Sequence, residues 1–348
     1  MATQSALPRP NDFSPGVLHD AYGKCLDLEK NSQQGQGDSD HDTGPLLTAR
    51  FLGYLLREIP GDSGREHLAN EIVLCVTDGD MSRIARYYMI HFVLVFKRGI
   101  TPPPLEHPSR PHFYEQGHSY HDILQNAQLD HYHAKKYALA RDRYLCCFTG
   151  NFDLDVYNSP DFLTWTQEPG SCARGTDAAH IIPDISDAGI ARRIGNSAFH
   201  NTKYASTVWT VLSRFSGDVT LLDHLAGHRI HSLENILTMD CMFHKMFDNL
   251  NVWLEPTDIP NIYRRCGNIE ASFYGLPRTV TLESSDPQLP LPSPVYIRLH
   301  AACARVANLS GAMEYIDSFW RDMENARVLA HDGSSMKLLQ ALSDLRLF

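Results

Sequence analysis

The sequence of 348 residues predicts an α+β protein that is mainly helical and is built around a small motif of two strands and a helix. Apolar residues recur at intervals of three and four over long stretches on both sides of the centre, which is typical of amphipathic helices. Shorter segments between them alternate apolar and polar residues, as half-buried strands do. Histidine, asparagine and aspartate residues gather around these central segments, so we expect the functional site there.

The composition is that of an ordinary globular protein. Hydrophobic residues make up 43% of the chain and charged residues 21%, which argues against a disordered or fibrous protein. The length suits two domains better than one. The longest apolar stretch, residues 87–96, is about half of the roughly 20 residues that a membrane span needs. We therefore expect no membrane partner.

The N-terminal part is expected to be helical after a flexible start. Residues 1–44 are predicted to be a flexible segment, because positions 31–44 hold no apolar residue and many turn formers. Residues 45–111 are predicted to be a helical region that ends in a proline-rich linker. Asp80 is expected to cap a helix in this region, and the three successive prolines at 102–104 cannot continue one.

Residues 112–256 are predicted to form the central domain, with an insertion at 184–230. A helix over 118–140 is expected to lead into a strand at 144–148, where apolar residues alternate. Residues 257–348 are expected to form a C-terminal region that is helical apart from one strand. The strand and its two helices are predicted at 272–284, 295–307 and 313–328.

One helix of the central domain carries two candidate metal ligands. His244 and Asp248 are four residues apart, which places both side chains on one face of a helix. Imidazole and carboxylate groups together suit a divalent transition metal or magnesium. We therefore predict one divalent ion, Mg²⁺, Mn²⁺ or Zn²⁺, as the cofactor.

Three segments of the central domain together resemble a known family. They are RDRYLCCFTG at 141–150, AAHIIP at 178–183 and ENILTMDCMFHKMFDNLNVWLEP at 234–256. Over roughly residues 140–256 the chain is similar to fungal proteins of the HNH endonuclease superfamily. The resemblance implies a ββα-metal core, in which a β-hairpin and a helix hold one metal ion between them.

The resemblance also implies roles for individual residues. His180 matches the general base, which takes a proton from water while a cation stabilises the charge on the phosphoryl group. Asn235 matches the residue that braces the hairpin loop. His244 and Asp248 match the metal ligands on the helix. The implied function is that of a metal-dependent phosphodiesterase, an endonuclease whose partner is nucleic acid.

Two features depart from the family pattern. Many HNH nucleases have an Asp or His ligand just before the general base, where this chain has Ala179. Asp177 is the nearest substitute as a third metal ligand, although its odd offset from His180 places the two side chains on opposite faces of a strand. In addition, 54 residues separate His180 from Asn235, so an inserted subdomain must bridge them. Its aromatic and aliphatic side chains suit a small-molecule pocket as well as a DNA groove.

Histidines also gather near the end of this insertion. His224 and His228 lie four residues apart, and His231 follows three residues later. On a helix they would share a face and could bind metal. We interpret them as ordinary surface or core histidines and leave them out of the predicted site.

The charge of the chain keeps other functions open. The formal net charge is −10, and residues 141–256 contain nine Lys and Arg against fourteen Asp and Glu. This is the wrong sign for a protein that holds a phosphate backbone through its overall field. One alternative is therefore an HNH-like scaffold for small-molecule biosynthetic chemistry, such as a cyclase of fungal secondary metabolism, that binds an apolar small molecule. A non-catalytic interaction protein is a third hypothesis.

The cysteines and the first residues of the chain indicate the cellular compartment of the protein. The eight cysteines include no C-x-x-C pair, so we expect buried or scattered thiols and no zinc knuckle. The first residues lack the basic and apolar runs of a signal peptide. We therefore expect an intracellular protein, in the cytoplasm or the nucleus, whose thiols stay reduced.

Overall fold

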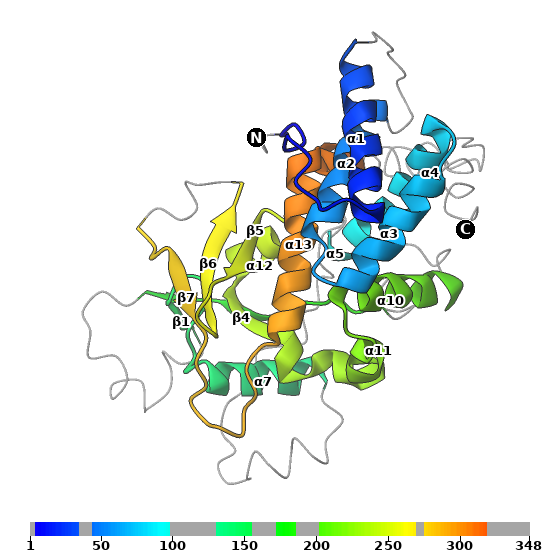
Figure 1. Cartoon of the computed structure of the whole chain (residues 1–348). Coiled ribbons are helices and arrows are strands. Elements are labelled where there is room, and N and C mark those ends of the chain that lie inside the picture. The colour runs from blue at the N-terminus through cyan, green and yellow to red at the C-terminus, as the bar shows by residue number, and fades with distance from the viewer. Residues whose placement is uncertain are drawn as a thin grey trace, which may run out of the picture.

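The computed structural model describes residues 4–34, 44–97, 130–154, 172–185, 202–268 and 275–318. Within these ranges the protein is mainly helical with small sheets, as the sequence predicts. Helix α13 (Pro294–Ser310) runs between the N-terminal helices and a three-stranded sheet, so one helix contacts both parts of the molecule (Figure 1). None of the described helices has the length and apolar character that a membrane span requires.

Six successive helical segments form the N-terminal part. They are α1 (Val17–Gln34), α2 (Pro45–Glu58), α3 (Asp62–Leu74), α4 (Asp78–Tyr88), the π-helix η1 (Met89–Val93) and α5 (Leu94–Phe96). The helices expected after residue 45 are therefore present. The predicted flexibility of residues 1–44 is wrong for α1, because Ala21, Tyr22, Cys25 and Leu28 recur at helical spacing and are buried. Residues 35–43 and the proline-rich stretch 98–111 lie outside the described residues.

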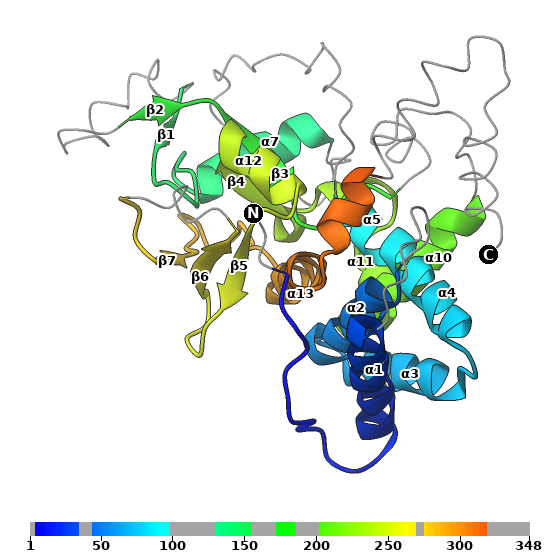
Figure 2. The same cartoon turned by 90° about the horizontal axis from the view of Figure 1, so that it is seen from above.

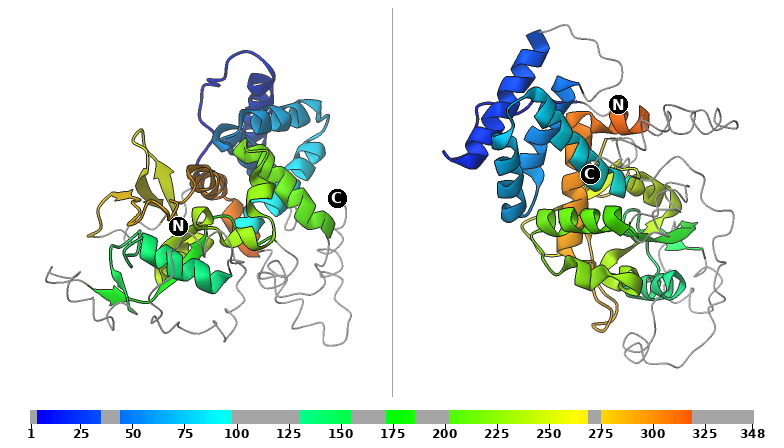
Figure 3. Two further views of the ribbon diagram at one scale, coloured as in Figure 1. Left: turned by 90° about the horizontal axis from the view of Figure 1, so that it is seen from below. Right: turned by 90° about the vertical axis from the view of Figure 1, so that its right-hand side faces the viewer.

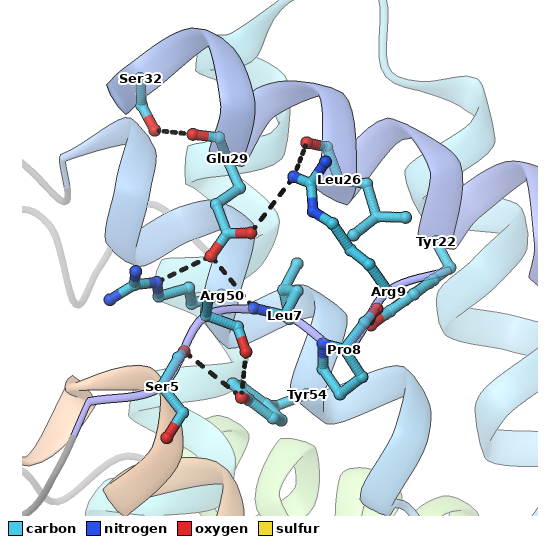
Figure 4. Close-up of polar contacts among 11 residues, drawn as sticks. Ser5, Leu7, Pro8, Arg9, Tyr22, Leu26, Glu29, Ser32, Arg50 and Tyr54 are labelled. Carbon is cyan, nitrogen blue, oxygen red and sulfur yellow. Dashed lines mark hydrogen bonds and ion pairs between the residues drawn. The ribbon is translucent and has the colours of Figure 1, made fainter. Parts of the chain in front are cut away.

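The segment before α1 is held across the helices by a buried carboxylate (Figure 4). Glu29 of α1 is 1% exposed and accepts hydrogen bonds from the backbone N–H of Leu7 at 3.1 Å and from Nε of Arg50 at 2.9 Å. The hydroxyl of Tyr54 donates to the carbonyl of Ala6 at 2.8 Å. The start of the described chain is thus fixed to α1 and α2 by hydrogen bonds to its backbone.

Helix α4 begins with a capping box. Thr77 is the N-cap residue, and its hydroxyl accepts a hydrogen bond from the backbone N–H of Asp80 at 3.1 Å. The carboxylate of Asp80 accepts from the backbone N–H of Thr77 at 2.8 Å. Asp80 therefore contributes to the cap as expected, but from the third helical position.

The insertion packs against the N-terminal helices through α10 (Thr202–Ser216), which is followed by α11 (Leu221–Leu225). Phe215 of α10 is fully buried and stacks on Tyr88, with ring centroids 5.1 Å apart. Helices α3 and α10 approach each other closely at Gly64, where an added Cβ atom would lie only 2.5 Å from the carbonyl oxygen of Arg214. The buried α10 side chains Val208, Val211, Leu212 and Phe215 thus belong to the main core.

The centre of the molecule is a two-stranded antiparallel sheet. Strand β3 (Thr176–His180) pairs with β4 (Ile236–Asp240), so that Thr176 lies opposite Asp240 and His180 opposite Ile236. Helix α12 (Cys241–Asp248) follows β4 directly, and the carboxylate of Asp240 caps it by accepting from the backbone N–H of Met242 at 2.9 Å. A strand, a second strand and a helix therefore adjoin here despite the long insertion.

Two helices cover opposite faces of this sheet. Helix α12 lies on one side of β3 and β4, and α7 (His131–Arg141) lies on the other (Figures 2 and 3). Ala178 belongs to a small buried cluster with Ala134 and Tyr137 of α7, whereas Ala179 belongs to the main core together with Phe243 of α12. Side chains therefore alternate along β3 between the α7 face and the α12 face. The N-terminal half of the predicted helix 118–140 lies outside the described residues.

The predicted strand at 144–148 is wrong. Arg143 and Tyr144 have positive φ angles of 52° and 60°, which break an extended chain. Residues 142–144 and 147–149 form turns, and Leu145 makes only an isolated β-bridge to Phe152. The alternation arises because Cys146 and Phe148 point into the core from these turns. The nearest regular strands are the short parallel pair β1 (Phe152–Asp153) and β2 (Ala173–Arg174).

The C-terminal part supports α12 from the side. Strands β5 (Val252–Pro256), β6 (Ile262–Gly267) and β7 (Thr279–Thr281) form an antiparallel sheet. The predicted strand at 272–284 is present as β7, and the predicted helix at 295–307 is α13. The imidazole of His300 on α13 stacks on Phe247 of α12 with ring centroids 3.6 Å apart. Residues 313–318 are helical, and the rest of the helix predicted there lies outside the described residues.

Candidate functional site

The structure distributes the predicted site residues over the two faces of the β3–β4 sheet. Asp177 faces α12 and meets His244, which stands one helical turn before Asp248. His180, at the end of β3, lies on the α7 face beside His131. The sheet therefore separates the predicted base from the three predicted metal ligands.

The group on the α12 face is Asp177, His244 and Asp248. Nδ1 of His244 lies 3.1 Å from Oδ2 of Asp177, and Nε2 of the same ring lies 3.6 Å from Oδ2 of Asp248. Burial raises the pKa of Asp177, but the hydrogen bond and charge of His244, with smaller effects of Cys241 and Lys135, outweigh it and lower this pKa to about 2. Asp177 is therefore ionised at neutral pH and can only accept a hydrogen bond.

This geometry assigns the proton of His244. Because the carboxylate of Asp177 accepts, Nδ1 of His244 carries hydrogen, so a cation bound beside Asp248 would take the place of any proton on Nε2. The arrangement is that of a metal-binding histidine whose other nitrogen donates to a carboxylate. The donor set that remains for a cation is one imidazole nitrogen and one carboxylate.

The group on the α7 face consists of three histidines from three elements. Nε2 of His180 lies 2.9 Å from Nδ1 of His231, the last residue of the 3₁₀-helix η4 (Gly227–His231). The ring of His131, at the start of α7, stacks on that of His180 with centroids 5.4 Å apart. One ligand nitrogen from each of the three lies within 4.8 Å of the others, and no other such group of three occurs in the described part of the chain.

The sequence does not reveal this histidine group. The sequence pattern predicts ordinary histidines at His224, His228 and His231, and it gives no signal for His131. His224 is exposed, lies near Asp218 and is not part of the group of three. His231 differs from His224 because it lies beside His180. The segment between His231 and β4 is bound to the end of β3 by hydrogen bonds.

Asn235 makes that connection. It is fully buried, and its Oδ1 accepts from the backbone N–H of Ile182 at 2.8 Å. Its Nδ2 donates to the carbonyls of Ile182 and Ile230 at 2.8 and 2.9 Å. One side chain therefore joins the turn after His180 to the residue before His231.

Arg141 fixes α7 to the same segment. Its side chain is fully buried, and its guanidinium donates to the carbonyls of Leu233 and Ile236 at 2.8 and 2.9 Å. It also forms an ion pair with Asp142, with Nε and Oδ1 2.7 Å apart. The start of β4, the end of α7 and the Asn235 contacts thus form one hydrogen-bonded unit.

Replacing Asn235 by alanine should lower the free energy of unfolding by about 2–3 kcal/mol, because three buried backbone groups would lose their partner. Urea denaturation followed by circular dichroism measures this. Asn70→Ala is the matched control, since Asn70 is exposed and makes one hydrogen bond to the carbonyl of Glu66. A loss in Asn235→Ala no larger than in this control would contradict the bracing role.

Comparison with known proteins supports the family resemblance. Residues 146–254 match the family model HNH_2, which is described as HNH endonuclease. No curated protein and no solved structure gives a significant match. The matched segment contains β3, β4 and α12, and therefore both His180 and the Asp177–His244–Asp248 group, whereas His131 and Arg141 precede it. The match to HNH endonuclease accordingly covers less than half of the chain and supports the resemblance of the segment 146–254 to the HNH superfamily.

Proposed function

We propose that the protein is a metal-dependent phosphodiesterase that cleaves nucleic acid, with β3, β4 and α12 as a ββα-metal core. The observation that supports this best is the meeting of Asp177 with His244 and Asp248 between strand and helix, inside the segment that matches HNH endonucleases. The substrate class follows from the family match, since fold alone does not fix chemistry.

His244 and Asp248 fit a divalent cation. They offer a nitrogen and an oxygen from one helical face, and their side chains are 17% and 14% exposed, so water and phosphate oxygens can complete the coordination. Mg²⁺ binds in this way, through one or two protein ligands plus waters and phosphate. Asp177 then orients His244 from the outer sphere and is not itself a ligand. When bound, the cation stabilises negative charge on the phosphoryl group and the leaving oxygen.

We keep His180 as the general base in this proposal because of the family resemblance and not because of the geometry, since the sheet separates it from His244 and Asp248. His231 would position it. If Nε2–H of His180 donates to Nδ1 of His231, the lone pair of Nδ1 on His180 can accept the proton of water. The protonated ring keeps the same hydrogen bond, so His231 supports the base before and after proton transfer. The histidine pair therefore needs no rearrangement during the reaction.

The small-molecule alternative has three motives, namely the acidic charge, Ala179 in place of a ligand, and the apolar side chains of the insertion as a pocket lining. The burial of Leu212 and Phe215 in the main core weighs against the third. The acidic charge of the chain opposes binding of nucleic acid through its overall field. We therefore expect binding to depend on the divalent cation and to weaken steeply with salt.

All eight cysteines are free thiols, which supports an intracellular setting.

Incubation of the purified chain with plasmid DNA and single-stranded RNA, with Mg²⁺, Mn²⁺ or Zn²⁺ in turn, tests the proposal. We expect cleavage that EDTA abolishes. His244→Ala should lower the rate at least about 100-fold at limiting cation, and Asp177→Asn should weaken the apparent cation affinity about 10–100-fold, as loss of an outer-sphere partner does.

His224→Ala is the control for this experiment, because His224 is a histidine of the same domain with a 58% exposed side chain. It should cleave at the wild-type rate. Absence of cleavage with every cation, or equal rates for His244→Ala and His224→Ala, would refute the proposed function.

A further inference from the structure

We propose that His131, His180 and His231 form a second metal site, selective for a borderline transition metal such as Zn²⁺, and that an ion bound there blocks His180 as general base. The binding part stands on the geometry of the three rings. The inhibition part rests on the proposed nuclease function.

The donor set selects the kind of ion. Three imidazole nitrogens within 4.8 Å of one another suit Zn²⁺, Cu²⁺ or Ni²⁺, whereas Mg²⁺ prefers oxygen ligands. A tetrahedral zinc ion with Zn–N bonds of about 2.0–2.1 Å holds its nitrogens roughly 3.3 Å apart. The His180–His231 pair, at 2.9 Å, needs only a small opening to reach that spacing. All three residues are partly exposed, so an ion can enter from solvent.

The three rings are held in place by the elements that carry them. His131 is the first residue of α7, His180 the last of β3 and His231 the last of η4. Arg141 ties α7 to the start of β4, and Asn235 ties the end of β3 to the segment of His231. Ligands on elements that are locked together by buried hydrogen bonds are preorganised for a metal.

A metal ion bound to the three histidines would prevent His180 from acting as the general base. A neutral imidazole that gives its Nε2 lone pair to a metal carries its proton on Nδ1. Nδ1 of His180 is the nitrogen that we propose accepts the proton of water, so a metal-bound His180 has no lone pair left for that step. Two cations would therefore act in opposite directions, one at His244 and Asp248 and the other at the three histidines.

The site is not specified by the HNH domain alone. His131 lies on α7, before the first residue of the segment that matches the family model. Removing His131 should therefore abolish the second site and leave both His180 and the α12 group intact. This makes His131 the informative position for a test.

Titration of the full chain with Co²⁺, followed by the visible absorption of the four-coordinate ion, tests binding without any activity assay. We expect wild type to show this absorption and Zn²⁺ to displace it. His131→Ala and His131→Gln should weaken Co²⁺ binding more than about tenfold. His244→Ala should keep the absorption. Unchanged binding in both His131 variants, or loss in His244→Ala alone, would overturn the site.

Inhibition is tested by adding Zn²⁺ to the Mg²⁺-supported cleavage reaction. Wild type should lose activity, and His131→Ala should need more than about tenfold higher Zn²⁺ for the same loss, with its rate in Mg²⁺ alone unchanged. Equal sensitivity of the two proteins would overturn the inhibitory role. If the chain cleaves no nucleic acid, the proposed function fails while the Co²⁺ titration still decides the metal site.

Discussion

Replacing His180 by alanine is expected to lower the rate of nucleic-acid cleavage about 10²–10⁴-fold, the usual contribution of a general base. The ring lies at the end of β3 with its Nε2 atom 2.9 Å from His231, and its removal leaves the strand pairing intact. The initial rate of plasmid nicking at saturating Mg²⁺ measures the effect, with urea denaturation to show that the variant is folded.

Two variants sharpen this prediction. His231→Ala should reduce the rate less than His180→Ala, because His231 positions the base without touching the substrate. His133→Ala is the matched control, since His133 lies on the same helix as His131 and its ring contacts Asp130 at the surface. An activity of His180→Ala within about threefold of this control would rule out His180 as the base, given the effect expected of general-base loss.

Arg141→Ala is expected to lower the free energy of unfolding by about 3–5 kcal/mol, the range for removing one partner of a buried ion pair. The side chain is fully buried, and its loss leaves the carbonyls of Leu233 and Ile236 without a donor beside the carboxylate of Asp142. Equilibrium urea denaturation measures the change.

Arg83→Ala is the control for Arg141, because the Arg83 side chain is 69% exposed and pairs with Asp80 at the surface. Its loss should cost less than about 1 kcal/mol. Arg141→Met keeps most of the buried aliphatic volume, so it separates packing from hydrogen bonding. Stability of Arg141→Ala equal to that of Arg83→Ala would show that the buried guanidinium does not hold α7 to β4.

Strand and helix periodicity could predict the α12 side of the site from the sequence. The spacing of His244 and Asp248 places both on one helical face, and the structure has them together. The odd offset between Asp177 and His180 predicts opposite faces of one strand, and that is where they lie. Such inferences succeed because they concern residues within a single regular element.

The α7 side could not be predicted in the same way. His131 and His231 reach His180 through the packing of α7 on the sheet and through the buried amide of Asn235, which are contacts between segments about 50 residues apart. The helix α1 and the turns at 142–144 and 147–149 were missed for a local reason. A polar tail obscured the apolar face of α1, and an alternating pattern also arises when turn residues point into a core.

The packing of α10 on α3 and η1 has a consequence for the independence of the HNH segment. Phe215 shares one core with Tyr88 and Phe92, while Arg141 and His131 reach the hairpin from before residue 146. A fragment limited to 146–254 would expose the apolar face of α10 and lack the guanidinium that secures β4. We therefore expect that the segment 146–254 does not fold as an autonomous module without the N-terminal helices and α13.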